Sequence, residues 1–472
     1  MKYIFELAAK LFLVGFIHQS TFGQVSTKAT AKDWLSLDPK ADSIAGISLS
    51  KAYKLLTGRH SKTVIVAVID NGFDLNHEDM KNVFWTNKQE IPGNGIDDDH
   101  NGYVDDIHGW NFRGARDGTI IENELAGATQ IYLTWKNRFE NKDTNSLPAI
   151  DKRDLIIFNK AKAEYFDKIQ NAKDSIEINY SYNINYHSSS LIQNDSETST
   201  NHFYGSPYIK LPPGVNHGTY VSGIIAAERN NSIGTNGIAD NVLIMPIVAS
   251  TQVGDERDKD VANAILYAVD NGAQLINISF SKLFSTDKRL LDEAIQYAEK
   301  KKVLIIHCAG NDGVNIDSVY NYHYPMPVYA NGTKAVHFIT VGWSRPLFDY
   351  RLAHPNSGYG KLNVDLFAPG SDIYTTAPHD QYDSRSGSSM STPVVTGVAA
   401  LLLSYFPLLT TKQVKDILLK SVFRPDQLVN KPGTKMLVPF RSLSVSGGIV
   451  NAYNAIELAI NKTKYVKNKI SN

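Results

Sequence analysis

The sequence predicts an α/β protein: a three-layer, doubly wound fold with a mostly parallel sheet and two buried central helices. Short apolar runs rich in valine and isoleucine alternate with helical patterns, as expected for strands buried on both faces of a parallel sheet. Two segments are apolar on nearly every side, which indicates helices enclosed by the core. One long polar region breaks the alternation and is expected to be an insertion of helix and loop.

Four apolar runs are predicted to be strands of the sheet. They are VIVAVI at 64–69, VLIMPIVA at 242–249, LINIS at 275–279 and VLIIHC at 303–308. Helical patterns occupy 259–271 and 287–300, and this alternation is typical of doubly wound α/β domains. Ligand-binding and catalytic groups of such folds gather at the carboxyl ends of the strands, so functional residues are expected there.

The N-terminus resembles a secretory signal peptide that is cleaved after Gly23. A basic start precedes an apolar run at 11–17, which is too short to span a bilayer because a spanning helix needs about 20 residues. The alternative is a buried N-terminal helix. We therefore expect an exported protein, secreted or held in the cell envelope, in which residues 24–58 form an N-terminal segment.

The chain has 48 basic and 48 acidic residues, and 42% of its 472 residues are hydrophobic. This balance gives no indication of a nucleic-acid or anionic-membrane partner. We expect a monomer whose partner is a protein or peptide substrate. Cys308 is the only cysteine, so no intramolecular disulfide can form, and its place in an apolar run favours a buried, inert thiol.

The main α/β domain is expected to span residues 59–465, followed by a tail at 466–472. The predicted insertion occupies residues 118–214 of this domain. One stretch of it has helical spacing, at Leu155, Phe158, Lys162, Tyr165 or Phe166, and Ile169. A Ser/Asn/Tyr-rich run follows without any period and is predicted to be loop.

Three residues with catalytic chemistry stand at the ends of separate buried elements. Asp70 follows the first strand, His217 begins an apolar helix, and Ser389 lies in SGSSMSTP at the start of another. The N-terminus of a buried helix favours a developing negative charge, which suits an acyl-transfer nucleophile. Pro393 is expected in the first turn of that helix, where its missing N–H costs nothing. Acid, imidazole and hydroxyl follow in the order Asp, His, Ser, which is the subtilisin-type order among serine hydrolases.

The stretches AVIDNG, NHGTYVSGIIAA, HCAGND and SGSSMSTPVVTGVAALL resemble the signature blocks of the subtilisin-like serine proteases, the subtilases. They occur in the order of the family, and the resemblance extends over most of the chain apart from the insertion. The family pattern Gly-Thr-Ser-Met-Ala-x-Pro aligns with residues 387–393, which makes Ser389 the nucleophile. The resemblance implies a subtilisin-like fold and an exported serine endopeptidase.

In this interpretation His217 takes the proton of Ser389 as general base and returns it to the leaving amine, while Asp70 fixes the imidazole tautomer. Asn311 matches the family's oxyanion asparagine, and the Ser389 backbone N–H is the second donor. The resemblance also implies residues that line the substrate cleft: Ser279, Phe280, Ser281, Ala309 and Gly310. The substrate backbone is expected to pair with edges near 250–254 and 279–281.

Four positions depart from the family pattern. Asn71 replaces the usual serine or threonine after the acid, and its amide is expected to donate to the Asp70 carboxylate. Ser388 replaces threonine and is expected to keep a hydroxyl near the oxyanion, while Tyr220 replaces a histidine outside the triad. Ser281 stands where glycine is usual, which leaves the shape and specificity of the cleft open.

Each catalytic candidate also has a simpler explanation when taken singly. Asp70 and Asn311 could be turn residues, His217 a neighbour of a helix cap, and Ser389 a serine at a helix start. Their combination in family order favours catalysis. The rival function is a non-catalytic binding module of the subtilase fold, with its cleft closed by the insertion and by Ser281.

The stretch PGNGIDDDHNGYVDD at 92–106 predicts a structural calcium site. Its candidate ligands follow in part the spacing of an EF-hand loop: Asp97, Asp99, Asn101, and Asp105 or Asp106. The loop is not a complete EF-hand, because His108 stands at the position of the last glutamate. The alternative is an acidic turn held by hydrogen bonds from backbone N–H groups to aspartate side chains.

Overall fold

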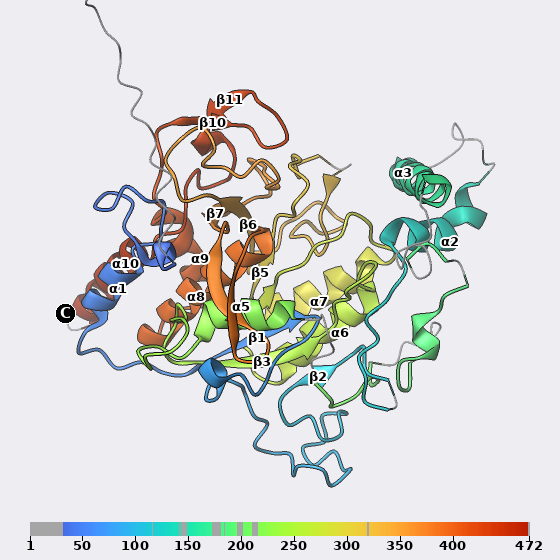
Figure 1. Ribbon diagram of the computed structural model, residues 1–472, viewed down its shortest axis with the longest axis horizontal. Helices are drawn as coiled ribbons and strands as arrows, with labels where there is room; N and C mark the ends of the chain where they lie inside the picture. The colour runs from blue at the N-terminus through green and yellow to red at the C-terminus, as the bar shows by residue number, and fades with distance from the viewer. Residues whose placement is uncertain are drawn as a thin grey trace, which may run out of the picture. The chain divides into compact units, whose positions relative to one another are not determined.

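The computed structural model describes residues 32–115, 117–140, 142, 149–171, 181–183, 185–195, 202–209, 216–318 and 321–470. The chain divides into two units, residues 1–31 and 32–472, and every described residue belongs to the second unit. The predicted signal peptide lies outside the described residues. The arrangement of the described elements is shown in Figure 1.

A seven-stranded parallel sheet of order β2-β3-β1-β4-β5-β6-β7 lies at the centre of the second unit. Its strands are β1 (Val64–Asp70), β2 (Trp110–Asn111), β3 (Val242–Val248), β4 (Leu275–Ile278), β5 (Leu304–Cys308), β6 (Phe338–Ser344) and β7 (Leu366–Pro369). The four predicted strands are β1, β3, β4 and β5, and all of their pairings are parallel. The predicted α/β fold is confirmed.

Helices and two small hairpins complete the described chain. The α-helices are α1 (Leu49–Leu56), α2 (Gly127–Phe139), α3 (Ala149–Asn171), α5 (His217–Ala226), α6 (Asp258–Asp270), α7 (Lys288–Lys300), α8 (Ser388–Tyr405), α9 (Thr411–Lys420) and α10 (Ala452–Ile470). The antiparallel hairpins pair β8 (Ile373–Ala377) with β9 (Gln381–Arg385) and β10 (Leu428–Asn430) with β11 (Leu437–Pro439). Short 3-10 turns lie at Trp34–Ser36, Glu78–Met80, Ser188–Ser190 and Phe440–Ser442.

Alternate residues of the central strands face opposite layers, as the pleat requires. In β1, Val66 and Val68 pack into the core that contains α5 and α8. Ala67 and Ile69 pack into the core of the other face, which contains α6 and α7. Both faces of the sheet are therefore buried, which explains why the strands are continuously apolar.

Helix α8 is buried along nearly its whole length and packs against α5 and the sheet. Within the described ranges it is the one helix long and apolar enough to cross a membrane, and its burial inside the protein is that of a core helix. The helix begins at Ser388, about one turn before the expected start, so Pro393 lies inside it and not in its first turn. The sequence prediction for Pro393 was wrong, because the Ser/Gly cluster is itself helical.

The N-terminal segment from Lys32 onward belongs to the same compact unit as the sheet. Trp34, Ile47 and Leu49 are almost completely buried in its core. Helix α1 packs against α10 near the other end of the chain, as Figure 1 shows. Residues 32–58 therefore belong to the same compact unit as the domain that was expected to begin at residue 59.

Candidate active site

The Asp70 carboxylate and the His217 imidazole are in direct contact at the carboxyl edge of the sheet. Asp70 is the last residue of the central strand β1, and its side chain is buried. His217 is the first residue of α5, and its Nδ1–H lies 2.9 Å from each carboxylate oxygen of Asp70. This bond directs the other ring nitrogen, Nε2, away from the carboxylate, so that it can accept a proton.

Asn71 supports this pair in a different way from that expected. Its backbone N–H, and not its side-chain amide, donates to Asp70 Oδ1 at 2.8 Å. Its side-chain Oδ1 accepts the backbone N–H of His217 at 3.2 Å. The helix start at His217 leaves a free N–H group, and the Asn71 side chain satisfies it.

The electrostatic surroundings raise the pKa of His217 above its ordinary value. Burial alone would lower this pKa, but the charge and hydrogen bond of Asp70 outweigh it. The Glu256 carboxylate also acts to raise the pKa, and the Arg385 guanidinium acts to lower it. Glu256 is itself buried, which raises its pKa to about 7, and it accepts a hydrogen bond from Ser250 at 2.7 Å.

Ser389 is the second residue of α8 and is partly exposed, whereas its neighbours Ser388 and Met390 are buried. The Ser388 N–H donates to Asn311 Oδ1 at 2.9 Å, which ties the exposed Asn311 to the start of α8. A Cβ atom built on Gly387 would lie 3.1 Å from Ser389 Oγ and 3.8 Å from Asn311 Oδ1. The nucleophile candidate and the oxyanion candidate therefore face the same small space.

Gly387 is the residue before α8, and its φ of 153° lies in the range that favours glycine. A side chain there would enter the space between Ser389 and Asn311. The glycine of the serine motif is thus needed both for its backbone and for the room it leaves beside Ser389.

Ser388 has a role other than the one expected. It is fully buried, and its hydroxyl lies with that of Ser281 beside the Cys308 thiol at the end of β5. Burial raises the pKa of Cys308 to about 11, although both hydroxyls act to lower it. The predicted buried thiol is confirmed, and the Ser388 hydroxyl contributes to packing behind the nucleophile.

A buried histidine supports the Asn311 turn from behind. His323 Nε2 donates to Asp312 Oδ2 at 2.9 Å, and this bond lowers the pKa of Asp312. The His323 ring packs so closely on Gly310 that an added Cβ would lie 2.4 Å from it. Gly310 also has a φ of 87°, so glycine is required at this turn for two separate reasons.

The two expected substrate edges are partly used by the protein itself. Val253, in the first edge, exchanges hydrogen bonds with Glu122 and Glu124 of the insertion, in a parallel bridge opposite Asn123. Lys282, just after the second edge, exchanges both backbone hydrogen bonds with Tyr324. The edge expected near 250–254 is therefore lined on one side by the insertion.

The predicted helix in the insertion is confirmed as α3, and it packs on α2 to form a hairpin. Their common apolar cluster includes Phe284, which follows β4 beside the predicted cleft. The first N–H of α2, at Gly127, donates to Asp255 Oδ2 at 2.6 Å. Burial raises the pKa of Glu164 on α3, and Asp255 and Asp312 raise it further. The hydrogen bond to Asp255 and the packing on Phe284 anchor the hairpin beside the predicted cleft, and Glu164 lies close enough to Asp255 and Asp312 to feel their charge.

The acidic loop at 92–106 combines the two arrangements that its sequence predicts, a hydrogen-bonded acidic turn and a cluster of carboxylates suited to a cation. Asp97 accepts backbone N–H groups from Asn101 and Gly102, and Asp105 accepts those of residues 93–95. These two predicted metal ligands hold turns, as the alternative interpretation expects. Asn101 points its Nδ2 toward Asp99 and Asp106, so it donates where a metal ligand would offer oxygen.

A second part of the loop has a donor set that fits a hard cation. Carboxylate oxygens of Glu90, Asp99 and Asp106 all lie within 4.8 Å of one another, and Glu90 and Asp106 are buried. Burial raises the pKa of Asp106 to about 6. Oxygen ligands from carboxylates at close quarters are those that calcium takes in proteins. Glu90 lies seven residues before Asp97, outside the EF-hand spacing, so the sequence gave no sign of this role.

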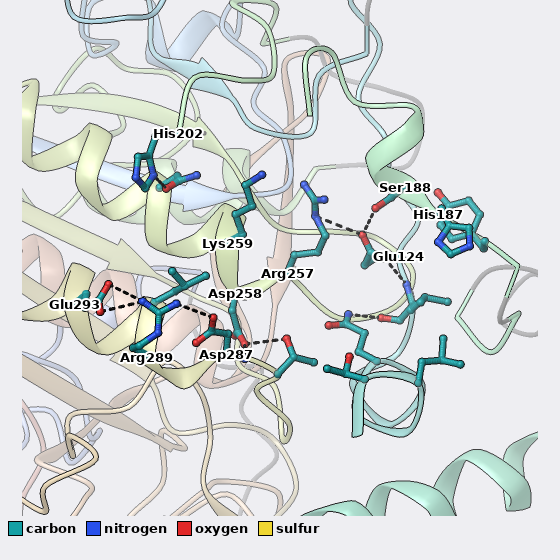
Figure 2. Close-up of a pocket in the computed structure, with 18 residues that line it drawn as sticks. Glu124, His187, Ser188, His202, Arg257, Asp258, Lys259, Asp287, Arg289 and Glu293 are labelled. Carbon is teal, nitrogen blue, oxygen red and sulfur yellow. Dashed lines mark hydrogen bonds and ion pairs between the residues drawn. The ribbon is translucent and has the colours of Figure 1, made fainter. Parts of the chain in front are cut away.

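A cavity of about 730 Å³ lies apart from the catalytic candidates, between the insertion and the starts of α6 and α7. Figure 2 shows ion pairs among the groups that line it: Arg257 points to Glu124, and Arg289 lies between Asp287 and Glu293. Behind it, the fully buried Arg113 pairs with Glu124 and Asp260. The pairs of Arg113 and Arg257 with Glu124 join the insertion to the α/β domain.

The profile of the subtilase family matches residues 61–440. Subtilisin-like protease 1 of Plasmodium falciparum is 26% identical over 435 residues, covering 90% of this chain and 48% of that protein. Thermitase of Thermoactinomyces vulgaris is 37% identical over 191 residues, covering 40% of this chain and 62% of that protein. The chain spans about half the length of the first curated relatives that it matches.

A solved structure described as the structural basis of subtilase cytotoxin SubAB assembly has a TM-score of 0.51 and 18% identity. The match covers 91% of this chain and 97% of that chain, and it supports the likeness of fold. The family profile includes the β1, α5, β5 and α8 blocks in one continuous match. The chain belongs to the subtilase family.

Proposed function

We propose that this protein is an exported serine endopeptidase that cleaves peptide bonds through an acyl-enzyme on Ser389. The observation that carries the proposal is the hydrogen-bonded Asp70–His217 pair at the carboxyl edge of the sheet. Asn311 follows β5 at this edge and accepts the Ser388 N–H at the start of α8, the helix that bears Ser389. Membership of a family with protease relatives supports the same activity. A signal peptide at 1–23 would account for export.

The residues are suited to the following steps. Ser389 Oγ attacks the carbonyl carbon of the scissile bond while His217 Nε2 takes its proton. The hydrogen bond from His217 Nδ1–H to Asp70 keeps the accepting lone pair on Nε2 and stabilises the imidazolium that forms. His217 then gives the proton to the amine nitrogen as the carbon–nitrogen bond breaks, and water hydrolyses the acyl-enzyme by the same route.

The negative charge on the carbonyl oxygen needs donors during attack. The Asn311 Oδ1 already accepts the Ser388 N–H, so its NH₂ group remains to donate to this oxygen. The Ser389 backbone N–H at the start of α8 is the second donor, and the helix dipole adds to the stabilisation. Such preorganised donors cost no reorganisation during the reaction.

Calcium is proposed as a structural ion of the acidic loop, held by Glu90, Asp99 and Asp106. Its charge would offset the repulsion among three close carboxylates, two of which are buried. The catalytic steps use none of these residues, so the ion would act on stability and not on the reaction.

A fluorophosphonate probe tests the proposed activity, because it reacts only with an activated serine in an open site. The wild-type protein should be labelled at Ser389, as identified by peptide mapping, and should cleave unstructured peptides internally. A binding module with a closed cleft would show neither labelling nor cleavage, and that pair of results would contradict the proposal.

A further inference from the structure

Arg385 lies beside the proposed catalytic base, although it belongs to a different element. It is the last residue of β9 and stands two positions before Gly387, at the start of α8. Its Nη2 donates to Tyr220 Oη at 2.7 Å, and its guanidinium carbon lies 4.6 Å from the centre of the Tyr220 ring. Tyr220 is three residues after His217 in the first turn of α5, so these contacts bring the guanidinium to the His217 side of the site.

The β8–β9 hairpin is held firmly in this position. Thr375 and Thr376 of β8 donate hydroxyl hydrogen bonds to the carbonyls of Tyr220 and Thr219, at 2.9 and 2.8 Å. Strand β9 pairs with β8 along its length, with Arg385 opposite Ile373. The position of the Arg385 backbone is therefore fixed relative to α5.

The Arg385 side chain keeps donors available for a ligand. It is 45% exposed, and its Nη2 is shared between Tyr220 and Asp383 Oδ2, the latter at 2.8 Å. Within the described chain, its Nε and Nη1 groups have no protein acceptor. These two donors are not adjacent to each other, but each is adjacent to Nη2. A carboxylate that displaces Asp383 from Nη2 can therefore bind through two parallel hydrogen bonds, one from Nη2 and one from a free neighbouring donor.

The chemistry of acyl transfer shows which half of a substrate would reach this group. The carbonyl oxygen must face Asn311, whereas the leaving amine must face His217 Nε2 in order to receive its proton. The acyl half is expected along 250–254 and 279–281, so the other half leaves the site past His217. The β8–β9 hairpin lies on that side, and Arg385 is its residue nearest the start of α8.

We propose that Arg385 is a specificity residue that binds an acidic side chain in the substrate, one to three residues after the scissile bond. The inference rests on the proposed peptidase function and adds a substrate class to it. The carboxylate would bind Nη2 together with one free donor, Nε or Nη1, and would compete with Asp383 for Nη2. The Glu256 carboxylate, the other acidic group near His217 besides Asp70, is buried and accepts the hydroxyl of Ser250, so it is not a partner of Arg385.

The test uses quenched fluorescent peptides that are identical before the scissile bond. Glutamate, glutamine or lysine is placed at each of the first three positions after that bond. We expect kcat/KM to be about threefold to tenfold higher for glutamate than for the isosteric glutamine at one of these positions, because an exposed but bidentate pair is involved. The ratio should fall as salt is raised. A ratio of one at all three positions overturns the inference.

Substitutions of Arg385 and Asp383 test whether the preference for glutamate depends on this arginine. Arg385→Ala should bring the glutamate-to-glutamine ratio to about one, and Arg385→Lys should leave an intermediate ratio, because lysine keeps the charge but loses the fork. Asp383→Asn is the matched control and should increase the ratio, since it removes the internal competitor. Comparing two peptides on one variant cancels any effect on His217. If Arg385→Ala were inactive, an unchanged ratio in Asp383→Asn and Arg385→Lys would overturn the inference.

The outcomes separate this inference from the function on which it rests. Labelling at Ser389 with peptide cleavage but no acidic preference would overturn the role of Arg385 alone. Absence of both labelling and cleavage in the wild-type protein would overturn the peptidase function and the specificity together.

Discussion

At the residue scale, three serines of the same cluster allow a controlled test of the nucleophile. Ser389→Ala should abolish hydrolysis and fluorophosphonate labelling, because it removes only the partly exposed hydroxyl at the start of α8. Ser388→Ala should remain active, since its hydroxyl is buried and faces Cys308. Ser391→Ala should also remain active but lose about 1 kcal/mol of stability, because its hydroxyl donates to the Ala368 carbonyl at 2.9 Å. An active Ser389→Ala variant would refute the assignment.

The surroundings of His217 predict the pH dependence of the reaction. The general base must be neutral, and its pKa is raised above the ordinary 6.5, so kcat/KM should rise with pH through a midpoint above 6.5. Asp70→Asn removes the main raising charge; the midpoint should move down and the rate fall on the order of 10⁴-fold. Arg385→Ala should move the midpoint up, because Arg385 lowers this pKa. A midpoint that moves the same way in both variants would contradict this electrostatic account.

Single residues were predicted well where a family block carries them and poorly elsewhere. Asp70 and His217 stand in short, recognisable blocks, and the structure places them in contact. Glu90 and Arg385 lie outside those blocks. Their positions depend on a loop fold and on a hairpin packed against α5, which no spacing along the chain encodes. For the hydrogen bond to Asp70, the sequence analysis chose the side-chain amide of Asn71 as donor and not its backbone N–H, because the two donors of one residue were equally plausible from sequence.

At the element scale, deleting the α2–α3 hairpin tests whether the insertion restricts access of substrates to the predicted cleft. The Ala126 N–H donates to the Ser181 carbonyl at 2.8 Å, so the residues that flank the segment 127–180 are adjacent and a short linker can join them. Replacing residues 127–180 with a Gly/Ser linker should raise cleavage of folded proteins several-fold relative to cleavage of small esters, if the hairpin forms a rim. This cut leaves the Arg113–Glu124 ion pair in place.

The deletion would expose Phe284, which packs against the hairpin in the intact protein, and this new apolar surface could cause aggregation. A control for that effect is needed. A second deletion variant that also carries Phe284→Ser distinguishes opened access from aggregation, and Phe284→Ser alone reports the effect of the substitution itself. Equal changes in the rates for proteins and for esters would show that the hairpin is a peripheral stabilising lobe.

The core strands and helices could be predicted because burial imposes strong patterns on them. β1, β3, β4 and β5 each appear as an apolar run, and α6 and α7 differ from their expected bounds by one residue at most. The β8–β9 hairpin was missed because β9 is mostly exposed and has no alternation. The early start of α8 was missed because serine and glycine are typical of loops when tertiary contacts are ignored.

At the scale of the whole molecule, stability should respond to calcium. The Ser389→Ala protein, which cannot digest itself, should melt at a higher temperature with calcium than with a chelator. An ion bound only by the folded state stabilises by about 2.7 kcal/mol at a hundredfold excess over Kd. Glu90→Gln/Asp99→Asn should abolish the shift, whereas Asp97→Ala should reduce it only through its turn. A shift that survives the double substitution would exclude this site.

The parallel architecture of the whole unit was predictable, whereas the strand order and the extent of the unit were not. Alternating apolar runs and helical patterns require a parallel sheet, but they do not say that β3 lies between β2 and β1. Residues 32–58 were set apart because they match no family block, although Trp34 and Leu49 are core residues. Tertiary packing, and not motif content, defines where the unit begins.

The burial of α8 between α5 and the sheet also governs when the protein can become active during its synthesis. Three of the four proposed catalytic side chains precede this helix, yet its start supplies Ser389 and positions Asn311. A nascent chain that ends before residue 388 lacks the nucleophile and the centre of one core layer. Ribosome-bound chains and truncated products should therefore be harmless to the cell that makes them, and proteolytic activity should arise only once nearly the whole polypeptide has emerged.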